Sequence, residues 1–224
     1  MGMRNKAIFA AVSLGLAFAG YVTVKKVGVQ MSLFEAVEKQ DSNAVKKALK
    51  SEQDINTQDS KGRTAVMIAT YNNDVKSAKF LIEAGADVNI QDDMQNSPFL
   101  YAGAEGYLDI LKLTTKAGAD PKITNRYGGI ALIPASEHGY VDVVKFLLTE
   151  TNSDVNHINN LGWTALLEAI ILGDGGKKQQ ETVRILLEHG ANPNLADRDG
   201  VTPLEHAEKL GYKEIEKLLR KARY

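Results

Sequence analysis

Four histidines are the residues of this chain most suited to bind a metal. Zinc is held by His, Cys, Asp and Glu, and a zinc site on one helix places two histidines four residues apart. The 224-residue chain has no cysteine, and no pair of its histidines has this spacing; they are His138, His157, His189 and His206. The sequence therefore predicts neither a metal site nor a cofactor.

The segment GDGGKK, at 173–178, has the glycines and lysines of loops that bind anions. A phosphate-binding P-loop needs G-x-x-x-x-G-K-[ST] after a strand, whereas these residues separate two expected helices. No calcium-loop spacing of acids follows Asp174. We interpret 173–180 as a turn enlarged by about five residues. A small-ligand or enzymatic site there is the alternative.

Nucleophilic and acid–base catalysis have little support in the sequence. There is no G-x-S-x-G motif, and no serine is accompanied by a local base. Glu137 and Glu168 are an acid pair that could approach in space, but acids are common on this surface. The sequence predicts a protein that is not an enzyme and has no catalytic residues.

The N-terminus differs in character from the rest. Arg4 and Lys6 precede 18 uncharged residues at 7–24, which contain AFA at 17–19. This pattern is typical of a secretory signal peptide cut after Ala19. An uncleaved membrane anchor and a buried helix are the alternatives, because 18 apolar residues just cross a bilayer. We expect 1–30 to be a signal peptide or anchor that exports or tethers the remainder, to the periplasm, the extracellular space or a membrane.

Composition limits the function classes. The chain is 44% hydrophobic and 25% charged, as in a folded globular protein, and its net charge is −1. Binding the phosphates of nucleic acid requires an excess of basic over acidic residues, so no nucleic-acid partner is predicted.

The rest of the chain consists of repeats. One phrase recurs at intervals of 33, 33, 34 and 38 residues, as GRTAVMIA, QNSPFLYA, GGIALIPA, GWTALLEA and GVTPLEHA from residues 62, 95, 128, 162 and 200. A second phrase follows in step, as FLIEAGADVN at 80–89 and LLEHGANPN at 186–194. Such a fixed period is typical of a solenoid, in which neighbouring units share one core.

Both phrases resemble the unit of the ankyrin repeat family. The fourth full unit, with GWTALLEAIILGDGG, is similar to a bacterial subfamily. The resemblance implies an all-α solenoid of helix-turn-helix units joined by hairpin-like fingers, after an N-terminal apolar helix. Residues 31–224 divide into a degenerate first unit at 32–58, units at 59–91, 92–124, 125–158 and 159–196, and a C-terminal cap at 197–224.

Recurring polar residues predict the helix starts. Thr64, Ser97, Thr164 and Thr202 are expected to cap the first helix of a unit by accepting a backbone N–H. Pro98 and Pro203 suit the next position, where a missing N–H costs nothing.

Four residues depart from the pattern. Ile130 replaces a capping Thr, and Gln95 replaces the finger glycine. Pro134 is expected inside a helix, where it would remove a hydrogen-bond donor. Asn152 stands near the usual helix-ending glycine, where Asn tolerates the left-handed conformation. We expect these residues to weaken units 92–124 and 125–158, through drift or with compensation by a partner.

The resemblance implies that partners lie in a concave groove, lined by the fingertips and the first helices. In this sequence aromatic, arginine and apolar residues, which are typical of interface hot spots, gather on adjacent units. The predicted partner-binding residues are Met94, Arg126, Tyr127, His138, Leu161 and Trp163. The alternative for Trp163 is packing on Leu161 of its own finger.

We therefore expect a monomeric, non-catalytic scaffold that binds one protein partner in its groove. A structural spacer anchored through 7–24 is another alternative. The identity of the partner is not readable from the chain.

Overall fold

The protein is described by a computed structural model, which covers residues 31–51 and 54–222. The apolar run at 7–24 lies outside these residues. Its interpretations as a signal peptide, a membrane anchor or a buried helix therefore remain predictions. No helix of the described part has the length and apolar character needed to cross a bilayer.

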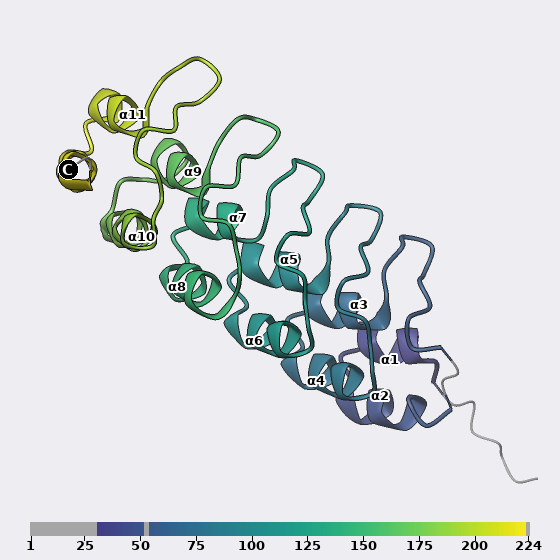
Figure 1. Ribbon diagram of the computed structural model, residues 1–224. Coiled ribbons are helices and arrows are strands. Elements are labelled where there is room, and N and C mark those ends of the chain that lie inside the picture. The colour runs from purple at the N-terminus through teal and green to yellow at the C-terminus, as the bar shows by residue number, and fades with distance from the viewer. Residues whose placement is uncertain (1–30, 52–53, 223–224) are drawn as a thin grey trace, which may run out of the picture. The chain divides into compact units, whose positions relative to one another are not determined.

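The described residues form helix pairs and no strand (Figure 1). Each predicted unit contains one pair. The pairs are α1 (Leu33–Glu38) with α2 (Ser42–Ala48), α3 (Ala65–Tyr71) with α4 (Val75–Glu83), α5 (Pro98–Ala104) with α6 (Leu108–Lys116), α7 (Leu132–Glu137) with α8 (Val141–Glu150), α9 (Ala165–Ile171) with α10 (Lys177–Glu188), and α11 (Pro203–Leu210) with α12 (Lys213–Ala222). The predicted all-α class is confirmed, with the N-terminal apolar helix outside the described residues.

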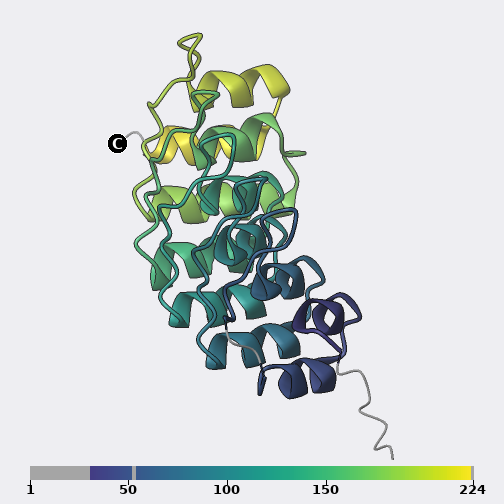
Figure 2. The ribbon, with the colours of Figure 1, turned by 90° about the vertical axis from the view of Figure 1, so that its right-hand side faces the viewer.

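Within residues 31–222 the pairs stack in two layers. The first helices of the units form one layer, the second helices form the other, and the fingers project beside the first (Figure 1). Successive pairs follow one another along the stack (Figure 2). The alanines that allow the two layers to touch are fully buried in one continuous core; they are Ala69, Ala102, Ala135, Ala169 and Ala207. Each unit thus completes the core of its neighbours.

The predicted helix caps are confirmed. The hydroxyl oxygens of Thr64, Ser97, Thr164 and Thr202 each accept a backbone N–H three residues on, at 3.3 Å. Pro98 and Pro203 are the first residues of α5 and α11. These caps satisfy donors that no helical carbonyl can reach.

Unit 125–158 begins its first helix differently. Ile130 is buried and α7 starts at Leu132 without a side-chain cap, as the loss of Thr predicts. Pro134 lies inside α7 as the sequence predicts, but it is in the first turn of this short helix. The Ile130 carbonyl there accepts from the N–H of Ile133 instead, at 3.0 Å. Pro134 therefore leaves no carbonyl of this turn unpaired.

The expectation for Asn152 is wrong. α8 ends at Glu150, and Thr151 is extended, with φ −134°. The Thr151 hydroxyl donates to the Leu147 carbonyl at 2.5 Å and accepts from the Ser153 N–H at 3.2 Å. Asn152 is not among the described residues with positive φ. A threonine thus takes the place of the left-handed glycine that ends α4, α6 and α10.

One polar residue organises each fingertip. Its side-chain Oδ1 accepts the backbone N–H groups two and four residues on, at 2.8–3.0 Å. We call these residues the fingertip Asx; they are Asp59, Asp92, Asn125, Asn159 and Asp197. The exposed tip is therefore held by hydrogen bonds within its own turn.

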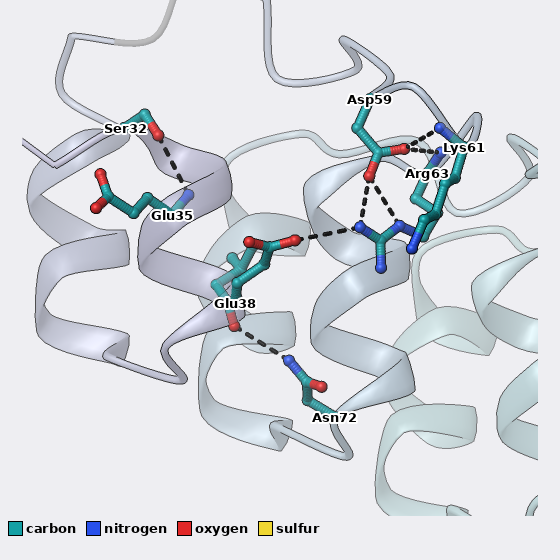
Figure 3. A network of polar contacts seen from close by, with 8 residues as sticks. Ser32, Glu35, Glu38, Asp59, Lys61, Arg63 and Asn72 are labelled. Atoms are coloured by element: carbon teal, nitrogen blue, oxygen red, sulfur yellow. Dashed lines mark hydrogen bonds and ion pairs between the residues drawn. The ribbon is translucent and has the colours of Figure 1, made fainter.

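The fingertip of unit 59–91 also joins the degenerate first unit to the stack (Figure 3). Arg63 Nε donates to Asp59 Oδ2 at 2.8 Å, and Arg63 Nη2 reaches Glu38 Oε1 of α1 at 3.2 Å (Figure 3). Asn72 Nδ2 donates to the Val37 carbonyl of the same helix at 3.2 Å. Polar contacts thus reinforce the apolar packing at this end.

The finger bases are linked by asparagine. The side-chain oxygens of Asn56, Asn89 and Asn156 each accept a backbone N–H of the next unit at 2.8 Å. Lys122 holds the corresponding position of unit 92–124. Lysine has no acceptor oxygen, so this link cannot form to unit 125–158.

Gln95 is expected to be a strained residue. It has φ 60°, while glycine occupies this position in the other four fingers, with φ from 70° to 85° at Gly62, Gly128, Gly162 and Gly200. Gln95→Gly should raise the free energy of unfolding by up to about 1 kcal/mol, because glycine adopts this conformation without a Cβ clash. Urea denaturation measures the change.

Gly200→Gln is the matched control, since a Cβ at Gly200 meets nothing within 4 Å. It should lower stability by a similar amount. An unchanged or lowered midpoint for Gln95→Gly would refute the strain argument.

Thr182 on α10 has a fully buried hydroxyl without a hydrogen-bond partner in the described structure. Thr182→Val should raise the free energy of unfolding by roughly 1 kcal/mol, because an unsatisfied polar group is removed at constant shape. Thermal and urea denaturation give the value. Thr114→Val should lower stability instead, since the buried Thr114 hydroxyl donates to the Ile110 carbonyl at 3.0 Å. Equal effects of the two changes would contradict this view.

Candidate functional site

Three large apolar side chains stand at the same place on successive fingertips. Met94, Tyr127 and Leu161 each lie two residues after a fingertip Asx, and they are 48%, 53% and 50% exposed. Lys61 and Asp199 hold this place on the fingers at either end. The structure thus forms an apolar row, defined as Met94, Tyr127 and Leu161, with a charged residue at each end.

Contacts between the tips keep the apolar row in place. Arg126 Nη1 lies 3.4 Å from Met94 Sδ, and its guanidinium carbon is 4.8 Å from the centre of the Tyr127 ring. The Asn160 N–H donates to the Tyr127 carbonyl at 2.8 Å. Arg126 therefore belongs with the apolar row, as a cation stacked on an aromatic face.

The other two predicted residues do not belong to the apolar row. Trp163 is half-buried, and its backbone N–H donates to Asn159 Oδ1 at 3.0 Å. His138 is exposed just after the last residue of α7, with its ring 5.3 Å from that of Tyr140. α7 therefore separates His138 from the tip that carries Tyr127.

A hollow of about 410 Å³ opens between the first two complete fingers. It is lined by Lys61, Arg63, Tyr71, Asp92, Asp93 and Met94. Met94 of the apolar row is thus shared between the fingertips and this hollow. The space joins the tips to the end of α3, which carries Tyr71.

A tyrosine network that the sequence analysis missed closes the floor of this hollow. The Tyr71 hydroxyl donates to Asp92 Oδ2, and Asn96 Nδ2 donates to the Tyr71 oxygen at 3.1 Å. The Tyr71 and Tyr101 ring centres are 4.4 Å apart. Burial, helped by the bond to Asp92, raises the pKa of Tyr71 to about 12. A tyrosine in the last turn of a first helix is the sequence signal for this network.

Glu168, on the first helix α9 of unit 159–196, is a buried carboxylate. Its exposed fraction is 6%, and Oε1 accepts from Asn159 Nδ2 at 2.7 Å. Burial raises the pKa of Glu168 to about 7, the negative charge of Glu137 adds to the rise, and the Asn159 bond opposes it. The structure thus brings together the acid pair that the sequence singled out, and Glu168 is protonated in part at neutral pH.

The following unit has the complementary pair. His206 stands nine residues after its fingertip Asx, as Glu168 does, and its Nε2 lies 2.7 Å from Asp197 Oδ2. Backbone hydrogen bonds, chiefly from Val201, and the bond to His206 hold the pKa of Asp197 below its usual range. In unit 159–196 the amide of the fingertip Asx donates to a carboxylate on the first helix. In unit 197–224 the fingertip Asx is itself the carboxylate, and an imidazole on the first helix is its partner.

The inserted residues at 173–180 form a pinned turn and the start of a helix. α10 begins at Lys177, so the insertion in part lengthens this helix. The Tyr212 hydroxyl donates to the Gly173 carbonyl at 2.9 Å, and the buried Gln179 donates to the Glu137 carbonyl at 2.9 Å. Within the described part of the chain no group of three His, Asp or Glu side chains could hold a metal ion.

Glu168 should make stability depend on pH. Its pKa in the folded chain, about 7, exceeds the ordinary 4.5, so the folded state binds more protons between these values. The free energy of unfolding should therefore fall as pH rises from about 5 to 8, relative to Glu168→Gln, which keeps an acceptor for Asn159. Urea denaturation across this range measures both proteins, and parallel curves would refute the prediction.

Comparison with known protein families gives a consistent match. The model for ankyrin repeats in three copies matches residues 33–125, 99–197 and 132–224, which together span most of the chain. An ankyrin repeat domain from Acinetobacter baumannii AYE is 55% identical, with a TM-score of 0.83, over 85% of this chain and 97% of that one. The ankyrin repeat protein EF0377 is 41% identical, with a TM-score of 0.82, over 86% of this chain and 98% of that one.

Matches to curated relatives are shorter. The chain is 57% identical to the ankyrin repeat protein YahD of Escherichia coli (strain K12) over 75 residues, which are 34% of this chain and 37% of YahD. It is 51% identical to ankyrin repeat protein L91 of Acanthamoeba polyphaga mimivirus over 49 residues, 22% of this chain and 8% of L91. These matches thus span well under half of either relative. The family model and the solved structures agree with the stacked helix pairs described above, and the chain belongs to the ankyrin repeat family.

Proposed function

We propose that this chain binds a protein partner along the apolar row, in the groove between the fingertips and the first helices. Ankyrin repeats generally mediate protein–protein interaction, and proteins built from them are typically non-catalytic. The observation that carries the proposal is the placement of Met94, Tyr127 and Leu161 on three successive tips, each about half exposed. A contiguous apolar patch with a polar border is typical of a binding surface.

The rigidity of the tips supports the same function. Each residue of the row follows a fingertip Asx that fixes its backbone, and the Tyr127 carbonyl is bonded to the next tip. A partner therefore meets a surface that is already ordered, and little conformational entropy is lost on binding. Arg126 and Tyr127, stacked on each other, are the residue types that most often dominate interface energies.

A photo-cross-linking amino acid at Tyr127 should capture the partner in cells. The matched control is the same amino acid at Lys145, which is exposed on the second-helix layer. With the partner then purified, Tyr127→Ser/Leu161→Ser should weaken the dissociation constant at least tenfold, since hot-spot truncations cost about 1–2 kcal/mol each.

Stability should be nearly unchanged by the two serines, because exposed substitutions alter it by about 0.5 kcal/mol or less. Equal capture from Tyr127 and Lys145, or unaltered binding by the folded double variant, would reject the apolar row as the binding surface.

A further inference from the structure

The acid pair lies beside the apolar row in the same step of the stack. Tyr127 and Leu161 stand on the fingers of units 125–158 and 159–196, and α7 and α9 of these units carry Glu137 and Glu168. α7 packs directly on α9. The Glu168 carboxylate is bonded to Asn159, the residue that holds the Leu161 tip. One step of the groove thus combines two apolar tips with two carboxylates on its floor.

Neither carboxylate has a cation from the chain itself. In the described residues, no ion pair includes Glu137 or Glu168. By contrast, Glu38 and Asp59 are paired with Arg63, and Asp197 is paired with His206. Between units 59–91 and 92–124, the fingertip carboxylate of Asp92 is hydrogen-bonded by Tyr71. The step between α7 and α9 therefore holds two carboxylates, Glu137 and Glu168, that form no ion pair within the described residues.

The charged groups around Glu168 leave this charge uncompensated. Glu137 faces it from α7, and its charge adds to the effect of burial. On α11 the imidazole of His206 is engaged by Asp197. On α10 the guanidinium of Arg184 is bonded to two acids of its own helix.

A cation supplied by a bound partner would offset both the burial of Glu168 and its repulsion by Glu137. Burial and mutual repulsion each raise the free energy of the ionised pair, and both diminish when a positive charge is placed between the carboxylates. Hydrogen bonds between an ammonium or guanidinium group and a carboxylate are strong where water is partly excluded. A partner covering Tyr127 and Leu161 would exclude that water.

We propose that the groove partner presents a lysine or arginine side chain that pairs with Glu137 and Glu168, next to apolar residues that cover Tyr127 and Leu161. The inference rests on the proposed function and adds the chemistry of the partner: a basic residue within an apolar segment. The charged group lies on the floor, and the apolar residues contact the tips.

Peptide selection tests this chemistry without knowledge of the partner. A random twelve-residue peptide library displayed on phage is selected against the full-length chain, and the enriched peptides are synthesised. They should contain one Lys or Arg beside aromatic or aliphatic residues. Glu137→Gln/Glu168→Gln should weaken their binding at least tenfold. Replacing the basic residue of the peptide by Ala should remove that difference, as a double-mutant cycle requires.

The pH dependence provides a second readout. Affinity of a basic peptide for the native chain should rise between pH 6 and 8 as Glu168 ionises, and it should stay level for Glu137→Gln/Glu168→Gln. Both substitutions keep the size of the side chain, and the amide oxygen introduced by Glu168→Gln can still accept from Asn159. Circular dichroism and urea denaturation check that this variant folds.

The outcomes separate this inference from the proposed function. Peptides that are lost with Tyr127→Ser/Leu161→Ser but bind Glu137→Gln/Glu168→Gln as well as the native chain would overturn the inference alone. Peptides indifferent to both variants, or a library without binders, would overturn both. Calorimetric binding of Ca²⁺ or Mg²⁺ that disappears in Glu137→Gln/Glu168→Gln would assign the pair to a metal ion and overturn the basic residue.

Discussion

The double hydrogen bond accepted by each fingertip Asx is the constraint on which the proposed binding surface depends. A tip in water has no neighbouring strand to satisfy its backbone, so one side-chain oxygen accepts two N–H groups at 2.8–3.0 Å. The residues between are then free to vary in type without changing the turn. Lysine, methionine, tyrosine, leucine and aspartate therefore occupy one position of the same scaffold.

In three of the five tips, the second polar atom of the Asx couples the tip to a first helix. Asp92 is bonded by the Tyr71 hydroxyl, Asn159 donates to Glu168, and Asp197 meets His206. A carboxylate can only accept, so it requires a donor, whereas an amide nitrogen requires an acceptor. The residue on the first helix thus complements the Asx of the tip. The bond from Asn159 also offsets part of the free-energy cost of burying the charged Glu168.

Local chemistry predicted the fold, and long-range placement limited the prediction of the site. The 33-residue period, the Thr and Ser caps and the first-turn prolines gave the helix pairs, because each feature acts within a few residues. Met94, Tyr127 and Leu161 could be aligned by register alone. The separation of His138, the half-burial of Trp163 and the engagement of Tyr71 by Asp92 depend on side-chain directions between units, which the period does not specify. Asn152 was misjudged because α8 runs longer than the repeat implies, and the late start of α7 places Pro134 in a first turn.

The unit with the weakest local signals is also the centre of the proposed surface. Unit 125–158 has no side-chain cap where Ile130 replaces threonine. It also has no asparagine bond to unit 92–124, because Lys122 stands at the asparagine position of that unit. Bonds between fingers still join this unit to its neighbours: Gln91 Nε2 donates to the Thr124 carbonyl at 2.9 Å, and the His157 ring lies 2.7 Å from the Gly128 carbonyl. In a linear repeat array stability is shared between neighbours, so a unit can lose its own caps without unfolding. The proposed binding role of Arg126 and Tyr127 is then compatible with weak local structure, because the adjoining fingers hold the tip in place.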